Sequence, residues 1–378
     1  MALAAVPLLI TGCAGPATSS KSASSAPSSA AGSSVATPMA GSIPVPAAPA
    51  PPACGDGAAL MVGVTGAADA RAVVGNHHVG GIMIGSWTDL SMLTDGTVAD
   101  IANLGPLPLA VSVDEEGGRV SRLSSLIGAV PPARTLAATQ TPEQVYQLAL
   151  SRGQQMRGLG ITVDFAPVVD VSDQGANTVI GDRSFSNDPA TVTSYAGAFA
   201  RGLRDAGVLP VLKHFPGHGH GSGDSHTAGA VSTPPLAQLM ESDLVPYRTL
   251  VAEAPVAVMI GHLEVPGLTG NTPASLSAAA INLLRSGGYG GPAFNGPVFS
   301  DDLSSMAAIN SRYGVAEAVL RALQAGTDVA LWITTDEVPS VLDRLEKAVA
   351  GGELAMPAVE GSVLRMAGIR GPSARCGG

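Results

Sequence analysis

The chain has 378 residues, of which 46% are hydrophobic and 13% are charged, and its formal net charge is −10. A chain of this length and apolar content can bury a large core, and one barrel of about 250 residues with a tail accounts for it. The acidic balance and the lack of a basic stripe exclude a nucleic-acid partner.

Residues 1–13 end in Leu9-Ile10-Thr11-Gly12-Cys13, which resembles a bacterial lipobox whose cysteine is lipidated after cleavage. The apolar stretch before Cys13 is too short to span a bilayer. It also lacks the Lys or Arg that precedes a signal core, so we expect translation to start upstream of Met1. Lipidation of Cys13 predicts an exported protein that faces the cell envelope and is held at the cell membrane by its lipid.

Residues 14–53 are rich in Ala, Ser, Gly and Pro and carry one charge, Lys21. Such a segment cannot bury a core, so we expect a flexible tether followed by one folded domain over residues 54–378. Cys54 and Cys376 then remain at the two ends of that domain. Because the ends of a barrel lie near one another and exported proteins meet an oxidising compartment, we expect a disulfide between them, with free thiols as the alternative.

Eight short apolar runs alternate with helical patterns along the domain, which predicts an α/β fold: a single (β/α)8 TIM-type barrel. Only Gly55 to Ala58 separate Cys54 from the first run, so we expect the N-terminal side of the barrel to be poorly covered. The predicted strands are Leu60–Val64, Gly81–Ile84, Leu107–Val113, Ile161–Phe165, Leu209–Leu212, Val256–Ile260, Val298–Ser300 and Val329–Ile333.

The segment from Lys213 to His226 gathers proton-transfer groups into a glycine-rich loop at the end of one predicted strand. A solvated loop without a role is one interpretation. A divalent metal site built from His218, His220, His226 and Asp224 is a second, although no known zinc spacing is present. The third is a dyad in which Asp224 orients His226, since one imidazole can donate a proton and later take it back.

Two adjacent aspartates, Asp301 and Asp302, follow another predicted strand. One carboxylate can cap a helix that begins near Leu303. The other can project into the mouth of the barrel as a nucleophile or ligand. The pair therefore predicts one structural and one chemical role.

Taken together, these motifs resemble glycoside hydrolase family 3, and in particular its single-domain β-N-acetylglucosaminidase branch. The resemblance rests on Lys213-His214-Phe215-Pro216-Gly217-His218-Gly219, Asp224-Ser225-His226 and Phe299-Ser300-Asp301-Asp302-Leu303-Ser304, with further matches at 113–122, 164–170 and 181–185. It implies a nucleophile at Asp301, a general acid/base at His226 and an orienting role for Asp224. It also implies that five residues hold the sugar: Asp114, Arg122, Arg183, Lys213 and His214. No cofactor and no metal are expected.

Each assignment has a plainer alternative. Arg183 could form a surface ion pair with Asp182, and His262 is as compatible with core packing as with the mouth. Glu115 and Glu116 are expected to be structural or to support a site residue and not to be catalytic, Asp170 to support a site residue, and His218 and His220 to lie in the loop within reach of substrate.

The resemblance implies a retaining exo-β-N-acetylglucosaminidase that trims cell-wall or muropeptide fragments. The partners expected are therefore a carbohydrate containing N-acetylglucosamine and, through the lipid, a membrane. Alternative functions are a family 3 β-glucosidase or glucanase, a sugar-binding lipoprotein, and a zinc-dependent hydrolase.

Overall fold

The computed structural model describes residues 56–105, 107–227, 229–253 and 255–369. The predicted lipobox at Cys13, the tether and the Cys54–Cys376 pair lie outside these residues and stay predictions. Within the described ranges, no helix combines the length and the apolar character needed to cross a membrane.

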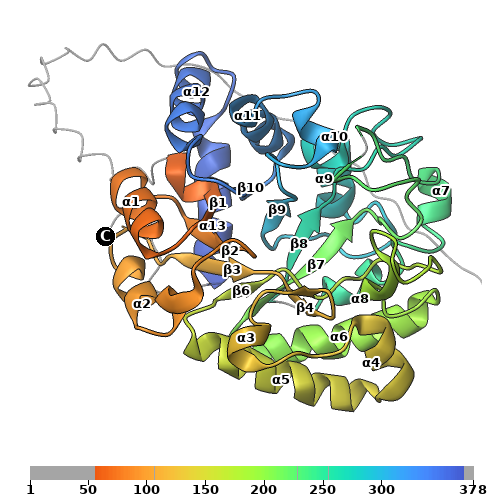
Figure 1. Cartoon of the computed structure of the whole chain (residues 1–378). Helices are drawn as coiled ribbons and strands as arrows, with labels where there is room; N and C mark the ends of the chain where they lie inside the picture. The colour runs from red at the N-terminus through yellow and green to blue at the C-terminus, as the bar shows by residue number, and fades with distance from the viewer. Residues whose placement is uncertain (1–55, 106, 228, 254, 370–378) are drawn as a thin grey trace, which may run out of the picture. The chain divides into compact units, whose positions relative to one another are not determined.

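A barrel of eight parallel strands forms the centre of the domain (Figure 1), which confirms the predicted fold. The strand order is β10-β1-β2-β3-β6-β7-β8-β9, and a parallel bridge from Phe299 to Val329 connects the two ends of the sheet. All eight predicted runs contain a strand, and the largest differences are of three residues: β3 begins three residues later and β7 ends three residues later than predicted. The strands are β1 Leu60–Val64, β2 Gly81–Ile84, β3 Ala110–Val113, β6 Val163–Asp164, β7 Leu209–Phe215, β8 Ala257–Ile260, β9 Val298–Ser300 and β10 Ala330–Trp332.

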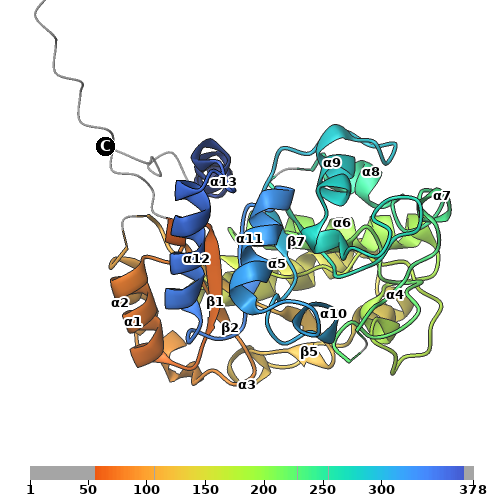
Figure 2. The same cartoon turned by 90° about the horizontal axis from the view of Figure 1, so that it is seen from above.

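Helices surround the barrel, as Figures 1 and 2 show from two directions. The α-helices of eight or more residues are α1 Ala67–His77, α5 Pro142–Gly158, α6 Pro189–Asp205, α9 Ala278–Ser286, α11 Val315–Ala325, α12 Val338–Ala350 and α13 Met356–Ile369. Shorter elements lie in the connections: α2 Thr97–Ala102, β4 Glu115–Gly117, β5 Val120–Ser121, α3 Ser124–Ile127, α4 Ala133–Thr139, α7 Leu236–Leu239, α8 Tyr247–Leu250 and α10 Ala307–Asn310.

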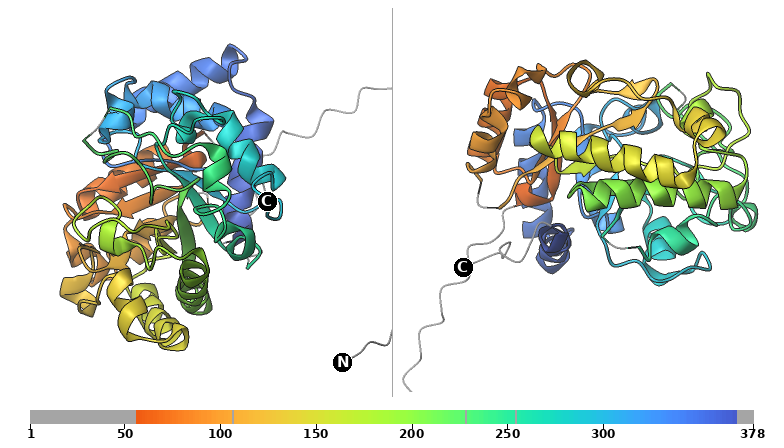
Figure 3. Two further views of the ribbon diagram at one scale, coloured as in Figure 1. Left: turned by 90° about the vertical axis from the view of Figure 1, so that its right-hand side faces the viewer. Right: turned by 90° about the horizontal axis from the view of Figure 1, so that it is seen from below.

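The two longest helices, α5 and α6, lie side by side on the outside of the sheet (Figure 3). Thr141 and Gln144 form a capping box that starts α5, and the Asp188 carboxylate caps α6. Gly202 allows the close approach of the pair, because a Cβ at this position would lie 2.5 Å from the carbonyl oxygen of Tyr146. The two helices support β6 and β7 from outside the barrel. The loops of the site extend from these two strands.

Two apolar layers follow from the alternation of side chains along the strands. In β1, Leu60, Val62 and Val64 pack outward against the helices, whereas Met61 faces the barrel interior. Phe165 and Phe299 meet edge to face inside the barrel, with 5.5 Å between ring centroids. The interior is therefore packed, and a ligand can enter only at its ends.

Helix α13 covers part of the N-terminal side of the barrel, which we expected to be poorly covered because the segment before β1 is short. Helix α13 contacts the 3₁₀ helix Asp56–Ala59. Its Met366 is buried in the same interior cluster as Met61 and Phe299. A C-terminal helix thus covers part of the end of the barrel that the short N-terminal segment leaves open.

Asp328 connects three elements at the point where β9 meets β10. Its buried carboxylate accepts hydrogen bonds from the Arg285 Nη2 on α9 at 2.6 Å, from the Arg365 Nε on α13 at 2.8 Å and from the Val298 amide at 2.8 Å. Two cations and an amide thereby compensate one buried charge. The closure of the barrel depends on this carboxylate.

We expect Asp328→Ala to lower the free energy of unfolding by about 3 kcal/mol, because both arginines and the Val298 amide lose their acceptor. Chemical denaturation monitored by circular dichroism measures the change. Asp343→Ala on the exposed face of α12 is the control, with an expected change within about 0.5 kcal/mol. Equal stability of the two variants would show that Asp328 does not hold the closure.

Candidate active site

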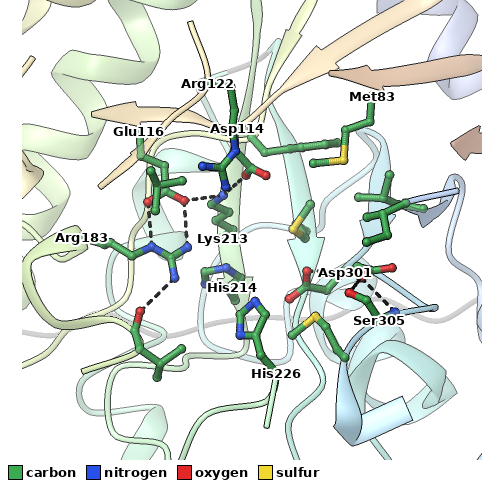
Figure 4. A pocket seen from close by; sticks show the side chains of 18 of the residues that line it. Met83, Asp114, Glu116, Arg122, Arg183, Lys213, His214, His226, Asp301 and Ser305 are labelled. Carbon is green, nitrogen blue, oxygen red and sulfur yellow. Dashed lines mark hydrogen bonds and ion pairs between the residues drawn. The ribbon is translucent and has the colours of Figure 1, made fainter. Parts of the chain in front are cut away.

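A cavity of about 410 Å³ opens at the C-terminal ends of the strands. In this fold family of barrels, active sites occupy that end. Figure 4 shows the cavity with Lys213 and His214 near its centre, Arg183 on one side and Asp301 on the other. All eight residues predicted for catalysis or sugar binding line it: Asp114, Arg122, Arg183, Lys213, His214, Asp224, His226 and Asp301.

A row of alternating charges forms one wall of the cavity. The Lys213 ammonium lies 2.6 Å from both the Asp114 Oδ1 and the Glu116 Oε1, and Arg183 donates two hydrogen bonds of 2.8 Å to Glu116. Burial opposes each charge, but the neighbouring opposite charges outweigh it. They lower the pKa of Glu116 and raise those of Lys213 and Arg183. Glu116, Lys213 and Arg183 therefore stay ionised.

Glu115 and Glu116 are adjacent in sequence and face different ways, because side chains alternate along a strand such as β4. Glu115 is fully buried and accepts hydrogen bonds from the amides of Arg122 and Leu123 and from the Arg152 guanidinium on α5. The hairpin is thereby fixed to the helix layer. The expectation of structural roles for both glutamates agrees with these contacts.

Arg183 is not part of a surface pair with Asp182, so that alternative is wrong. Asp182 instead lies 3.3 Å from Arg119, whose Nη2 also donates to the carbonyl oxygens of Thr178, Val179 and Ile180. Asp182 is thus committed to Arg119. Arg183 points its guanidinium to the buried Glu116.

Lys213 and His214 both line the cavity although they are neighbours on one strand. Regular alternation would send them to opposite faces, but the pairing of β7 with β8 shifts register between Leu212 and Phe215. The Asp170 carboxylate holds the His214 Nδ1 at 2.7 Å and accepts from the amides of His214 and His218. Burial alone would raise the pKa of Asp170, but His214 and the His218 amide lower it overall. Since an ionised Asp170 accepts the Nδ1 proton, the His214 Nε2 remains for a ligand.

His218 and His220 do not line the cavity, contrary to their expected reach. His218 is buried, and its Nε2 lies 3.2 Å from the Ser225 Oγ, directly before the dyad histidine. Burial, with the nearby His214, lowers the pKa of His218 to about 4. His220 lies 2.9 Å from Asp243, and this hydrogen bond raises the pKa of His220. Both histidines therefore support the loop and not the ligand.

The predicted dyad is present in the loop. The His226 Nδ1 lies 2.7 Å from the Asp224 Oδ1, which also accepts the His226 amide at 2.9 Å. Partial burial works to raise the pKa of Asp224, but these two bonds lower it overall. The carboxylate fixes the imidazole so that Nε2 is available to a ligand. The carbonyl oxygens of Ser225 and His226 accept from the amides of Ala308 and Ala307 in α10, which connects the loop to the β9 side of the barrel.

Asp302 has the structural role expected of one of the two aspartates. Asp302 accepts hydrogen bonds from the amides and hydroxyls of Ser304 and Ser305, so it fixes the turn that follows β9. The predicted helix start near Leu303 is this turn, and α10 begins only at Ala307.

The Asp301 carboxylate lines the cavity and is ionised at neutral pH. Burial alone would raise its pKa, but His262, His214, His226 and the Asp302 amide together lower the pKa of Asp301 to about 2. His262 itself is buried outside the cavity lining, between the Ser275 hydroxyl and the Asp302 carbonyl oxygen. His262 thus supports the Asp301–Asp302 turn through its contact with the Asp302 carbonyl oxygen.

Sequence reasoning missed the apolar part of the site. Trp87 stands at the rim, and Met83, Met259, Leu331 and Ile333 line the cavity. The periodicity of the strands predicts which side chains point into the barrel. It does not predict which of them lies at the C-terminal end and so lines the cavity. Over the described ranges, no group of three or more His, Cys, Asp or Glu residues is arranged to hold a metal ion.

Comparison with known proteins agrees with this geometry. The model of the glycosyl hydrolase family 3 N-terminal domain matches residues 57–369. Beta-hexosaminidase LpqI of Mycobacterium tuberculosis is 70% identical over 321 residues, which are 84% of this chain and 82% of the relative.

Solved structures give the same result. A family 3 glycosyl hydrolase from Mycobacterium smegmatis superposes with a TM-score of 0.83 at 72% identity, covering 84% of this chain and 96% of that one. A family 3 β-N-acetylglucosaminidase from Paenibacillus gives a TM-score of 0.77 at 33% identity, covering 83% of this chain and 61% of that one. The chain therefore belongs to glycosyl hydrolase family 3 and is a glycosidase.

Proposed function

We propose that this family 3 β-hexosaminidase is a retaining exo-enzyme that releases terminal β-linked N-acetylglucosamine from cell-wall fragments. The observation that carries the proposal is the pairing, in one cavity, of an ionised carboxylate at Asp301 with the His226–Asp224 dyad. A nucleophile and a proton donor on the same cavity are the two groups that retaining hydrolysis requires.

In the first step, the Asp301 carboxylate attacks the anomeric carbon while the protonated His226 gives its proton to the leaving oxygen. The glycosidic bond breaks and a covalent glycosyl–Asp301 ester forms. Asp224 stabilises the charged imidazole before the transfer and keeps its Nε2 directed to the cavity.

In the second step, the neutral His226 takes a proton from water, and the resulting hydroxide displaces Asp301 from the anomeric carbon. Two displacements at one carbon retain its configuration. His226 is protonated again and Asp301 is ionised again, so the cycle closes without a further reactant.

The charged wall suits recognition of one terminal sugar. Asp114 can accept from ring hydroxyls, whereas Lys213 and Arg183 can donate to others. The Arg122 side chain forms no hydrogen bond or ion pair with the described part of the chain, so its guanidinium remains for the ligand.

Two relatives support N-acetylhexosamine as the sugar, since one bears the name beta-hexosaminidase and the other is a β-N-acetylglucosaminidase. The alternative of a β-glucosidase or glucanase is disfavoured by the dyad, since those relatives take their acid from elsewhere. Membership in an enzyme family contradicts the alternative of a sugar-binding lipoprotein without activity.

We expect Asp301→Ala to lower turnover of 4-nitrophenyl β-N-acetylglucosaminide at least about a thousand-fold, because no other group replaces the nucleophile. Added azide should restore product as the α-glycosyl azide, the inverted isomer. Wild-type enzyme should prefer this substrate to the β-glucoside, with equal rates with and without chelator. Rescue that gives the β-azide would assign the nucleophile to another residue.

We expect His226→Ala to slow substrates with poor leaving groups far more than activated ones, because only the former need protonation. The measurement is kcat/KM across aryl N-acetylglucosaminides of graded phenol pKa, in which the variant should depend more steeply on that pKa than wild type. Azide should here yield the β-azide. Equal losses across the series would contradict the acid role.

We further propose that Cys13 is lipidated, that residues 14–53 tether the domain to the cell membrane, and that Cys54 and Cys376 are bonded. Support comes from the sequence alone, since all three cysteines lie outside the described residues. Mass spectrometry of protein from the native host should find a lipid on Cys13 and, without reduction, a peptide joining Cys54 to Cys376. Protein recovered from the membrane fraction with an unmodified Cys13 would contradict the anchor.

A further inference from the structure

A second cavity, of about 370 Å³, adjoins the active site on the side of β10, β1 and β2. The two cavities share Trp87 and Ile333, so the indole stands on the boundary between them. Trp87 is 41% exposed, whereas the other tryptophan, Trp332, is fully buried. An exposed aromatic face at the edge of a sugar site is a stacking surface for a second ring.

The indole is held in place by the turn that carries it. The Thr88 hydroxyl donates to the Val64 carbonyl oxygen at 2.6 Å and accepts the Gly85 amide at 3.0 Å. Gly85 has no side chain to displace the ring, since a Cβ there would lie 2.4 Å from two indole carbons. The ring therefore rests against the Gly85 backbone and is preorganised for contact.

Hydrogen bonds tie the loops together on two other sides of the active site. Behind the charged wall, Arg119 ties the β4–β5 hairpin to the carbonyl oxygens of residues 178–180. Beside Asp301, the dyad loop is hydrogen-bonded to the amides of Ala307 and Ala308. A glycan whose terminal sugar lies between these elements has room to continue past Trp87 and Ile333.

We propose that the second cavity is a subsite for the sugar on the leaving-group side of the scissile bond, with the Trp87 indole stacked on that sugar's ring. The inference rests on the proposed function, because it assumes that Asp301 and His226 mark the position of the bond that breaks. Trp87 is thus a specificity-determining residue that binds the leaving sugar and takes no part in proton transfer.

The rim of the second cavity supplies polar groups suited to sugar hydroxyls. Asp69 on α1 holds two of them in place, accepting from the Thr65 hydroxyl at 3.1 Å and from the Thr335 hydroxyl at 2.7 Å. Both hydroxyl oxygens keep acceptor capacity. Asp336 is exposed at the same rim and forms no hydrogen bond or ion pair with residues of the described chain. An aromatic face with acceptors around it matches a pyranose ring, whose C–H face is apolar and whose edge carries hydroxyls.

The kinetic test compares two substrates in the full-length protein. N,N′-diacetylchitobiose has a sugar as its leaving group, and N-acetyl-β-glucosaminyl fluoride has none. Trp87→Ala should lower kcat/KM for the disaccharide about tenfold, mainly by raising KM. It should leave kcat/KM for the fluoride within about twofold of the wild-type value. Gly85→Ala, which retains the indole but displaces it, should give a loss in the same direction.

Leu364→Ala is the matched control, because Leu364 is a large apolar side chain on α13 that is 52% exposed. It should leave both substrates unchanged. Equal losses on the disaccharide and the fluoride in Trp87→Ala would place the indole against the first sugar and overturn the proposal. If wild-type enzyme hydrolyses neither substrate, the proposed function fails, whereas an unchanged disaccharide rate in Trp87→Ala removes only the subsite.

Fluorescence gives an independent measurement, because Trp87 is the exposed member of the two tryptophans. In Asp301→Ala, which binds without turnover, diacetylchitobiose should protect the exposed emission from iodide quenching. N-acetylglucosamine alone should not. Protection by the single sugar to the same extent would contradict a leaving-group subsite.

Discussion

The active site depends on one buried cation. Lys213 is only 2% exposed, and its ammonium group is compensated by Asp114 from the end of β3 and Glu116 from the β4–β5 hairpin. Removing Lys213 would take from Asp114 the ion pair it forms in the described chain and from Glu116 one of its two, and leaving a buried charge unpaired costs several kcal/mol. The charged wall, the hairpin and the 174–183 loop are therefore positioned by the same ion pairs, which Arg183 extends through Glu116.

A second series of contacts connects the buried residues of the site to the exposed dyad. Asp170 holds His214 and the His218 amide, His218 reaches the Ser225 hydroxyl, and Ser225 precedes His226. With its low pKa, His218 is uncharged at neutral pH and adds no positive charge near the dyad. The dyad side chains are 58% and 41% exposed, so their orientation depends on these buried neighbours and on α10.

The two sides of the cavity differ in chemistry because they belong to different parts of the barrel. The charged groups follow β3 and β7: Asp114 and Glu116, two residues apart, face the same wall, and the register shift after Leu212 turns both Lys213 and His214 inward. The opposite side, from β10 through β2, presents Trp87, Ile333 and a threonine rim. A terminal sugar rich in hydroxyls suits the first side, and an aromatic platform suits a ring that must bind and then leave.

The sequence by itself determined the eight strands, the loop after β7 and the structural role of one of the aspartates Asp301 and Asp302, because apolar runs, glycines and adjacent carboxylates are local signals. Only the tertiary structure decided that Arg183 pairs with Glu116 and not with Asp182, and that His218 and His220 face away from the cavity. It also decided that α13 covers part of the barrel end and that Trp87 stands between two cavities. These outcomes depend on contacts between residues tens to hundreds of positions apart, such as Glu116 with Arg183 or Asp69 with Thr335. Side-chain periodicity along one strand does not indicate which distant residue a side chain will contact.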